Sequence, residues 1–350
     1  MQARHPVVTR DLEQIIGAQV PWERLRGKTI LISGASGVLP AYMVETLLFL
    51  NERISGFNVR VLGLVRNHGR ATARFAAYSG REDLSLVVGD VSQALPPGLG
   101  ADIVIHAASQ ASPIYYDTDP VGTLAANVLG THHLLELSRV SGAEAFLYFS
   151  SGEVYGEVDA ANVPTTESDY GYLDPTRVRS CYGESKRLGE TMCVAYHHQH
   201  GVPATIARPY HTYGPGIRLA DGRVFADFVG DIVARRPLVM KSDGSATRAF
   251  CYLSDATVAF FQVLLAGESG VSYNVGNDEA ELSILALAQV LGDEFGLDVV
   301  EQARETAGEY VPSTITRSAP DVTRLRRLGW KPTVPVREGF RRTIATFATT

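Results

Sequence analysis

From Lys28 onward, short runs of apolar and β-branched residues alternate with longer segments in which apolar positions recur every three or four residues. The short runs are predicted strands and the longer segments predicted helices. Because the strands are apolar throughout, rather than at every second position, we expect both of their faces to be buried. Such strands, separated by helices, predict an α/β protein with a doubly wound parallel sheet.

The predicted elements follow one another regularly up to Tyr210. Predicted strands span residues 28–34, 58–65, 84–90, 101–109, 145–151 and 204–210. Predicted helices span residues 9–20, 41–52, 70–79, 119–142 and 180–201. Beyond Tyr210, the loop-rich segments 211–223 and 240–250 are interleaved with helices, which predicts a smaller second domain over the carboxyl edge of the sheet.

Composition narrows the class of protein. The chain has 350 residues and a formal net charge of −6, which argues against nucleic acid as a partner. Cys181, Cys193 and Cys251 have no CxxC spacing, so reduced thiols in a cytoplasmic protein are expected. No secretory signal and no membrane-spanning run is visible. The paired histidines at 132–133 and 197–200 lack carboxylates or thiols at ligand spacing, so no metal site is expected.

Two glycines follow the first predicted strand, in "GASGVLPAYM". Gly34 and Gly37 would stand at a strand-to-helix turn, where backbone N–H groups can approach a pyrophosphate. The third position of this motif, usually glycine, is Pro40, which the first turn of a helix tolerates. The turn therefore predicts a dinucleotide site.

The second predicted strand ends in Arg66 and Asn67, where an acidic residue would mark NAD. Arg66 fits the 2′-phosphate of NADP, or it stacks on adenine and leaves the choice to Asn67. The sequence favours NAD slightly and leaves NADP open. Asp90 and Val91, after the third strand, are expected to border the adenine.

Tyr182 and Lys186 lie four residues apart on a predicted helix and therefore share a face. A fixed ammonium favours the phenolate, so we expect the lysine to lower the pKa of the tyrosine. Ser151, at the end of a predicted strand, would bring a hydroxyl to the same edge. A hydroxyl, a phenol and an ammonium around a nicotinamide form a proton relay for alcohol–ketone interconversion.

The chain resembles the extended short-chain dehydrogenase/reductase family, specifically its nucleotide-sugar epimerases, dehydratases and decarboxylases. The likeness rests on the glycine turn, "HAASQAS", "SSGEVYG", "YGESK", "ARPYHTYGPG", "GSATRAFCYLSD", "YNVGN" and "LGWKP". Within the family, "RSCYGESKRLGETMCVAY", "DGRVFADF" and "GSATRAF" look most like UDP-glucuronate decarboxylases. The resemblance implies a Rossmann fold, a tightly held NAD, a nucleotide-sugar substrate and a homodimer.

The resemblance also assigns the domains. It implies an N-terminal extension over 1–26 and an NAD-binding domain over 27–207 with a returning segment at about 248–275. The nucleotide-sugar-binding domain would take residues 208–247 and 276–350.

The resemblance implies three sets of site residues. The catalytic residues would be Ser151, Glu153, Tyr182 and Lys186. The cofactor would be bound by Gly34, Ser36, Gly37, Val38, Leu39, Arg66, Asn67, Asp90, Val91, Ala107, Ala108, Ser109, Asn127, Tyr182, Lys186 and Pro209. The substrate would be bound by Ser112, Arg179, His211, Arg223 and Arg248, with Arg223 and Arg248 on the diphosphate and Arg179 on a sugar carboxylate.

Departures from the family pattern separate the reactions. Where 4,6-dehydratases carry Asp and Glu after the catalytic hydroxyl, this chain has Gly152 and Glu153. Without that acid a dehydratase is disfavoured, and Glu153 suits a decarboxylase. His211 replaces an asparagine that usually touches the substrate. Decarboxylation of a nucleotide hexuronate is the leading hypothesis, and 4-epimerisation is the alternative. A hypothesis outside enzymes is a non-catalytic dinucleotide sensor.

Overall fold

The computed structural model describes residues 3–301 and 315–348 and contains a seven-stranded parallel sheet. Its strands are β1 (Thr29–Ser33), β2 (Arg60–Val65), β3 (Leu84–Val88), β4 (Ile103–His106), β5 (Ala145–Phe149), β6 (Ala204–Pro209) and β10 (Ser272–Val275). They are arranged in the order β10-β6-β5-β4-β1-β2-β3, and every neighbouring pair is parallel. The prediction of a doubly wound Rossmann sheet is therefore confirmed.

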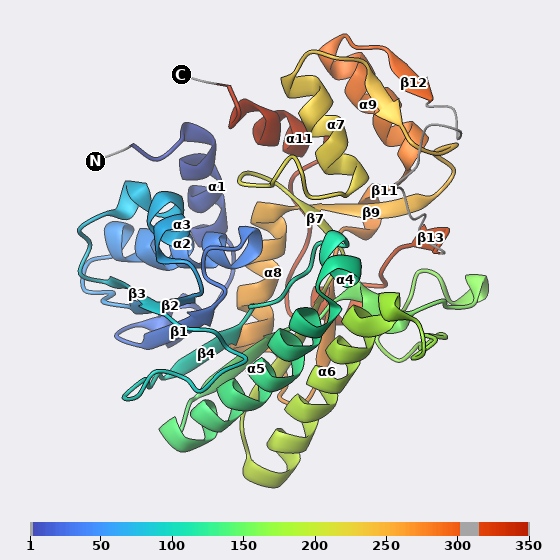
Figure 1. The fold of residues 1–350 in the computed structure, drawn as a ribbon. Helices are drawn as coiled ribbons and strands as arrows, with labels where there is room; N and C mark the ends of the chain where they lie inside the picture. Colours follow the sequence, from blue (N-terminus) through green and yellow to red (C-terminus); the bar gives the residue numbers. More distant parts are fainter. Residues whose placement is uncertain (1–2, 302–314, 349–350) are drawn as a thin grey trace.

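Helices cover both faces of this sheet (Figure 1). One face carries α1 (Pro6–Ile16), α2 (Val38–Arg53), α3 (His68–Arg74) and α8 (Leu253–Ala266). The other carries α5 (Pro120–Ser141) and α6 (Cys181–His200), which pack side by side. Within β1, Ile30 and Ile32 pack into the apolar cluster beneath α2 and α8, and Leu31 packs into the cluster beneath α5 and α6. Both faces of the strand are therefore buried, which explains why its residues are apolar throughout.

Several element boundaries differ from the prediction. Helix α1 begins at Pro6 and ends before Gly17, earlier than the predicted residues 9–20. Helix α2 begins at Val38, three residues before the predicted start, because Pro40 lies in the first turn, where no intrahelical N–H partner is required. Helix α3 is shorter than predicted and gives way to a 3-10 turn over Ala76–Tyr78.

A second group of elements, called the C-terminal lobe below, packs around its own apolar cluster (Figure 1). It contains β7 (His211–Tyr213), α7 (Val224–Val233), β8 (Leu238–Met240), β9 (Thr247–Tyr252), β11 (Glu281–Ser283), α9 (Ile284–Phe295), β12 (Val299–Glu301), β13 (Arg317–Ser318) and α11 (Val336–Ala345). Strand β9 pairs with β7, β11 and β13, and β8 pairs with β12. The remaining helices are α4 (Ile114–Thr118) and α10 (Thr323–Arg326), and 3-10 turns span Trp22–Leu25, Gly152–Tyr155, Ala160–Asn162, Val178–Ser180 and Asp278–Ala280.

The loop-rich reading of residues 211–223 and 240–250 was wrong in part, because both segments contain strands of this lobe. Strand β7 has three residues, too few for a period to be visible. Its partner β9 lies far along the chain, and such pairing is decided by tertiary packing.

Asp11 of α1 connects the N-terminal segment to both the parallel-sheet region and the C-terminal lobe. Its buried carboxylate accepts hydrogen bonds from Tyr42 of α2, Tyr252 of β9 and Arg342 of α11. Buried carboxylates are stabilised only when such donors surround them. Across the described residues, no helix combines the length and the apolar character that crossing a lipid bilayer requires.

Candidate active site

The turns after β1 and β4 approach each other closely where the strand order reverses. Gly34 has φ +66°, and a Cβ there would lie 2.7 Å from the Cα of Ala108. The Ser33 hydroxyl accepts hydrogen bonds from the N–H groups of Ala107 and Ala108, each at 3.1 Å. Any side chain at position 34 would therefore collide with the neighbouring backbone, so the turn requires glycine.

The N-terminus of α2 opens beside this turn. Gly37 is its N-cap residue and is exposed, while Ser36, Val38 and Leu39 are half-buried. The first N–H groups of a helix have no intrahelical acceptor and, with the helix dipole, favour an anion. A glycine-lined turn at a helix N-terminus and at a reversal of strand order fits the pyrophosphate of a dinucleotide.

Several buried polar atoms near this edge have no hydrogen-bond partner among the described residues, including Ser109 Oγ and Asn127 Oδ1 as well as His106 Nε2 and Gln110 Oε1. The Asn127 amide nitrogen donates to Ser185 Oγ of α6 at 2.9 Å, which fixes its orientation. Buried polar atoms are rarely left without a partner, so Ser109 Oγ and Asn127 Oδ1 fit a polar ligand such as a nicotinamide ribose.

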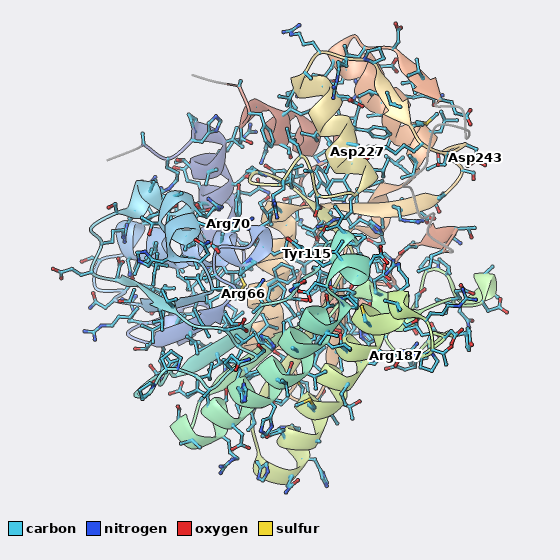
Figure 2. The ribbon with its side chains drawn as sticks, in the orientation of Figure 1. Arg66, Arg70, Tyr115, Arg187, Asp227 and Asp243 are labelled. Carbon is cyan, nitrogen blue, oxygen red and sulfur yellow. The ribbon has the colours of Figure 1, made fainter. Side chains whose placement is uncertain are left out.

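Arg66 and Asn67 follow β2 and are exposed; Figure 2 shows Arg66 and Arg70 in this region. The Asn67 side chain caps α3 by accepting a hydrogen bond from the Arg70 N–H at 2.9 Å. Hydrogen bonds from Gln110 and the Gly122 N–H, together with the charge of Arg66, lower the pKa of Asp119. Arg66 is therefore near enough to Asp119, the N-cap residue of α5, for the two charges to interact.

The remaining predicted cofactor residues lie at strand ends. The Asp90 carboxylate accepts from the N–H and the hydroxyl of Ser92, at 2.9 and 2.8 Å. Val91 is buried against Gly130 of α5. Pro209 is half-buried at the end of β6.

The structure brings Tyr182, Lys186 and Ser151 together where β5 meets α6. Tyr182 and Lys186 are buried, with 5% and 2% of their surface exposed. Lys186 Nζ lies 5.7 Å from the centre of the Tyr182 ring and donates to the Phe149 carbonyl at 2.7 Å. Ser151 is two residues beyond Phe149 and caps the 3-10 turn that carries Glu153.

The electrostatics of the pair differ from the sequence-based expectation. Burial raises the pKa of Tyr182 to about 12; the Ser151 hydroxyl lowers it, Glu153 raises it, and Arg223 and Arg179 lower it. Burial lowers the pKa of Lys186 to about 7, and Glu190 opposes that change. The expected lowering of the tyrosine pKa is therefore absent, because desolvation of the phenolate outweighs every nearby charge.

Tyr116, which the sequence reasoning missed, forms one wall of the site. Its ring stacks on that of Tyr182, with centroids 4.8 Å apart and an interplanar angle of 18°. The Arg179 guanidinium lies 4.8 Å from the centre of the Tyr116 ring, and its Nη2 is 3.5 Å from Glu153 Oε2. The adjacent tyrosines in "PIYY", after "HAASQAS", were the available signal; Figure 2 labels Tyr115 of this pair on α4.

Gly152 lies against an aromatic ring. A Cβ at this position would be 3.3 Å from two ring carbons of Tyr210. Such a contact is tighter than ordinary packing, so a larger side chain would require Tyr210 to move. The glycine that replaces the dehydratase aspartate at position 152 therefore fits the space that Tyr210 leaves there.

On the opposite side, Arg223 and Arg248 come from the C-terminal lobe. Arg223 Nε donates to Asp221 at 2.5 Å, and the Asp221 carbonyl accepts from Ser112 Oγ at 2.7 Å. The Arg248 guanidinium donates to the carbonyls of Thr247 and Ile315, at 2.7 and 2.8 Å.

His211 is near both arginines. Burial lowers its pKa to about 3, with further lowering from Arg248 and then Arg223, so its ring is neutral near pH 7. Its buried Nδ1 has no partner among the described residues. The structure therefore places a buried, neutral ring with a free hydrogen-bonding nitrogen close enough to both arginines for their charges to act on it.

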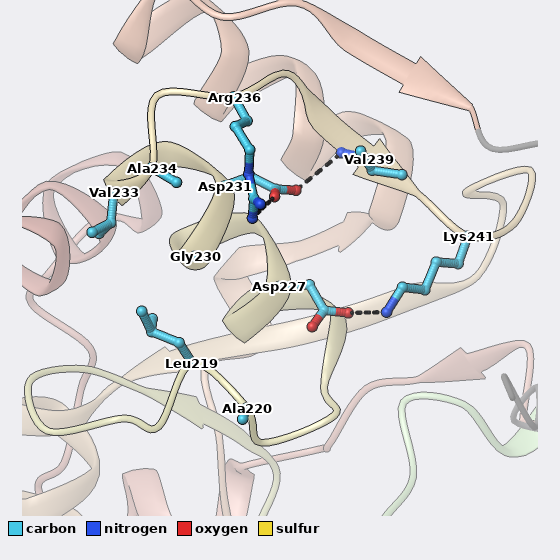
Figure 3. A pocket seen from close by; sticks show the side chains of 10 residues that line it. All are labelled: Leu219, Ala220, Asp227, Gly230, Asp231, Val233, Ala234, Arg236, Val239 and Lys241. Carbon is cyan, nitrogen blue, oxygen red and sulfur yellow. Dashed lines mark hydrogen bonds and ion pairs between the residues drawn. The ribbon is translucent and has the colours of Figure 1, made fainter.

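The C-terminal lobe is also hollowed beside α7 (Figure 3). The hollow measures about 550 Å³ and is lined by Leu219, Ala220, Asp227, Gly230, Asp231, Val233, Ala234, Arg236, Val239 and Lys241. Its charged groups pair with each other, Lys241 with Asp227 at 2.9 Å and Arg236 with Asp231 at 3.0 Å. Asp227 and Lys241 also border a smaller cavity of about 70 Å³ beside Arg248.

Comparison with known proteins shows which family and which solved structures this chain is similar to. The profile of the NAD dependent epimerase/dehydratase family matches residues 30–276. The chain is 33% identical over 312 residues to UDP-glucuronic acid decarboxylase 6 of Arabidopsis thaliana, covering 89% of this chain and 86% of the relative. A dTDP-glucose 4,6-dehydratase of Streptomyces venezuelae, solved with NAD bound, has a TM-score of 0.76 at 25% identity, covering 91% of this chain and 96% of that chain. A UDP-glucuronic acid 4-epimerase of Bacillus cereus has a TM-score of 0.75 at 22% identity, covering 91% and 98%.

Proposed function

The chain belongs to the NAD dependent epimerase/dehydratase family and is an enzyme, and from this premise we propose that it oxidises the C4 hydroxyl of a nucleotide hexuronate and then decarboxylates it. A nicotinamide dinucleotide is the cofactor of this family. The relatives at 33% identity are UDP-glucuronic acid decarboxylases, which supports the same reaction class here.

One observation carries the choice of an anionic sugar. Arg179 lies on the Tyr116–Tyr182 stack and forms an ion pair with Glu153 at 3.5 Å. A guanidinium beside the tyrosine that would meet C4 is suitably located for a carboxylate at C6. Because its partner Glu153 is half-exposed, a substrate carboxylate can compete for this arginine.

The proposed chemistry assigns a role to each buried group. When bound, the nicotinamide supplies an acceptor for the C4 hydride. Tyr182 takes the proton from the C4 hydroxyl while Ser151 holds the oxygen by a hydrogen bond. Tyr182 must have lost its own proton to solvent before it can accept this one, and the positive charge of Lys186 favours that phenolate.

The C4 ketone then places the C6 carboxylate β to a carbonyl. The C5–C6 bond breaks, CO₂ leaves, and the bonding electron pair moves through C5 onto the C4 oxygen as an enolate. A proton from water must next be added at C5, and Glu153 is the nearby residue proposed to relay it or to position the sugar for it. The product is a 4-keto pentose, either released or reduced again at C4.

A 4,6-dehydration is disfavoured because Gly152 offers no acid and packs against Tyr210. We propose NAD as the cofactor in preference to NADP. If NADP were bound, Arg66 would be the residue that contacts its 2′-phosphate. We also propose that the protein is a cytoplasmic homodimer. Exposed apolar side chains on α5 and α6, such as Val121 and Val194, support the dimer.

The test is incubation with UDP-, dTDP-, CDP- and GDP-linked hexuronates and hexoses, followed by mass spectrometry of the nucleotide product and by ¹H NMR, which distinguishes C4 epimers of equal mass. Loss of CO₂ from a hexuronate supports the proposal. An unchanged mass with inverted C4 would assign a 4-epimerase, and loss of water a dehydratase. Bound NAD with no turnover of any sugar would instead favour a dinucleotide sensor.

A further inference from the structure

Three buried side chains form a stripe along α6. Tyr182, Lys186 and Glu190 are spaced four residues apart and therefore share one helix face, with 5%, 2% and 9% of their surface exposed. This face packs against the end of β5. The proposed mechanism uses the first two residues and leaves Glu190 without a role.

The Glu190 carboxylate is fixed at the centre of a buried network. Its Oε1 accepts from Ser150 Oγ at 2.5 Å, and Arg208 of β6 donates to both carboxylate oxygens, at 2.8 and 2.6 Å. Arg208 is itself held by the Tyr155 hydroxyl at 2.8 Å and the Glu167 carbonyl at 3.0 Å. Paired in this way, two buried charges are compatible with the folded state.

Consecutive residues at the end of β5 are therefore held by α6. The Phe149 carbonyl accepts from Lys186, and the Ser150 hydroxyl donates to Glu190. Ser151, the next residue, interacts with Tyr182. Glu190 thus fixes the strand end that presents the reactive serine.

Glu190 also lies one helical turn from Lys186, and its negative charge opposes the lowering of the lysine pKa by burial. The other titratable groups facing the lysine are Tyr182 and Cys193 of α6, Tyr148 of β5, whose ring centre is 5.0 Å from Nζ, and His106 of β4. Burial raises the pKa of Tyr148 and Cys193, and it lowers that of His106 to about 3. These groups are neutral near pH 7, which leaves Glu190 as the source of negative charge.

We propose that Glu190 is a positioning residue of the active site, which keeps Lys186 an ammonium and holds the Phe149–Ser151 backbone in register with α6. The part that concerns turnover rests on the proposed function. The part that concerns the charge of Lys186 does not, because the lysine titrates whether or not a substrate is present.

The first test follows the protonation of Lys186 directly. The lysines of the chain are Lys28, Lys186, Lys241 and Lys331, so a protein carrying ¹³C at lysine Cε gives few NMR signals. The signal missing from K186R identifies Lys186. In the wild type its midpoint is expected near pH 7. In E190Q it should fall by about one pH unit or more, because the opposing carboxylate is gone while burial remains.

Matched variants separate this role from general damage. E184Q removes a carboxylate from the same helix that pairs with Arg187 at 3.3 Å, and it should leave the Lys186 midpoint unchanged. E190Q leaves Arg208 without its partner, so E190Q/R208Q, which removes both buried charges, provides a second sample if E190Q does not fold. The midpoint should fall there too, and E190D should restore it.

Activity gives an independent readout. On a nucleotide sugar that the wild type turns over, the alkaline limb of kcat/KM should move to lower pH in E190Q and stay in place in E184Q. An unchanged Lys186 midpoint in folded E190Q, or in folded E190Q/R208Q, would overturn the proposal. Absence of turnover in the wild type would overturn the proposed function alone, since the NMR titration still decides the role of Glu190.

Discussion

On the sheet side of the site, Tyr182 and Lys186 are almost fully buried, with 5% and 2% of their surface exposed. On the side that faces solvent and the C-terminal lobe, the Arg179 and Arg223 side chains keep 46% and 37% of their surface exposed. The buried groups are held by the ends of strands. Arg179 pairs with the partly exposed Glu153, Arg223 pairs with the largely buried Asp221, and Arg248 is held by backbone carbonyls.

This difference separates two tasks. Groups that move protons need a fixed, dry environment in which charges act strongly. Groups that bind a charged substrate must exchange one partner for another, and exposed ion pairs contribute little, so they exchange easily. We therefore expect substitutions on the sheet side to change kcat or cofactor binding, and substitutions on the other side to change KM.

The largest effect is expected for Y182F. Removing the phenol hydroxyl while keeping the ring stacked on Tyr116 should lower kcat by about 10³-fold, the usual contribution of an acid–base group. Dinucleotide affinity, measured by calorimetry, should stay unchanged. Y116F keeps the same stack without touching the proton relay and serves as the control. Full activity in Y182F would contradict the assigned relay.

The second effect concerns the glycine turn, where the chain offers a matched pair. Gly34 and Gly27 have φ values of +66° and +71°, but a Cβ at Gly34 meets Ala108 at 2.7 Å, whereas a Cβ at Gly27 meets nothing within 4 Å. Both alanine variants should lose about 1–2 kcal/mol of unfolding free energy from the left-handed backbone.

G34A alone carries the steric clash with Ala108. It should therefore weaken dinucleotide binding by a further 10- to 100-fold, roughly, as overpacking predicts. Equal dinucleotide affinities in G34A and G27A would show that the turn at Gly34 is not part of the cofactor site. Calorimetric titration with NAD and with NADP measures the effect, and it also tests the preference for NAD.

On the substrate side, R248A should raise KM for the nucleotide sugar by about 10-fold or more, the contribution of one hydrogen-bonded charge, and leave kcat nearly unchanged. R236A removes an exposed arginine that pairs with Asp231 in the α7 hollow and should change neither constant. A fall in kcat without a rise in KM for R248A would show that this arginine acts in the chemical step and not in substrate binding.

The last effect is one on the free energy of unfolding in acid and not on turnover. The folded protein holds His211 and His106 with pKa values near 3, so the unfolded chain binds more protons once the pH falls below about 6.5, and stability falls with it. Between pH 7 and pH 5 each histidine should account for about 2 kcal/mol of lost unfolding free energy.

Denaturant unfolding of H211N at the two pH values should recover about half of the combined loss. The exposed His198 is the control, and H198N should lose as much stability in acid as the wild type. An acid sensitivity of H211N equal to that of the wild type would show that His211 is not held neutral by burial.

The sequence predicted the parts of the molecule that depend on local patterns. Strands such as β1 are apolar on both faces, and the pair Tyr182 and Lys186 has helical spacing, so the sheet and the shared helix face of this pair could be anticipated. The stack of Tyr116 on Tyr182 and the network of Glu190 with Arg208 join remote segments, and no periodicity encodes them. The pKa of Tyr182 depends on the depth of burial, which composition does not reveal.

The most direct measurement uses UDP-glucuronate labelled with deuterium at C4 and ¹³C at C6. We expect the wild type to release ¹³CO₂, with the deuterium retained at C4 of the pentose or found on the reduced cofactor, and we expect neither event in Y182F. Retention of ¹³C in a nucleotide hexuronate after C4 has been oxidised, or loss of the C4 deuterium to water, would contradict the proposed mechanism.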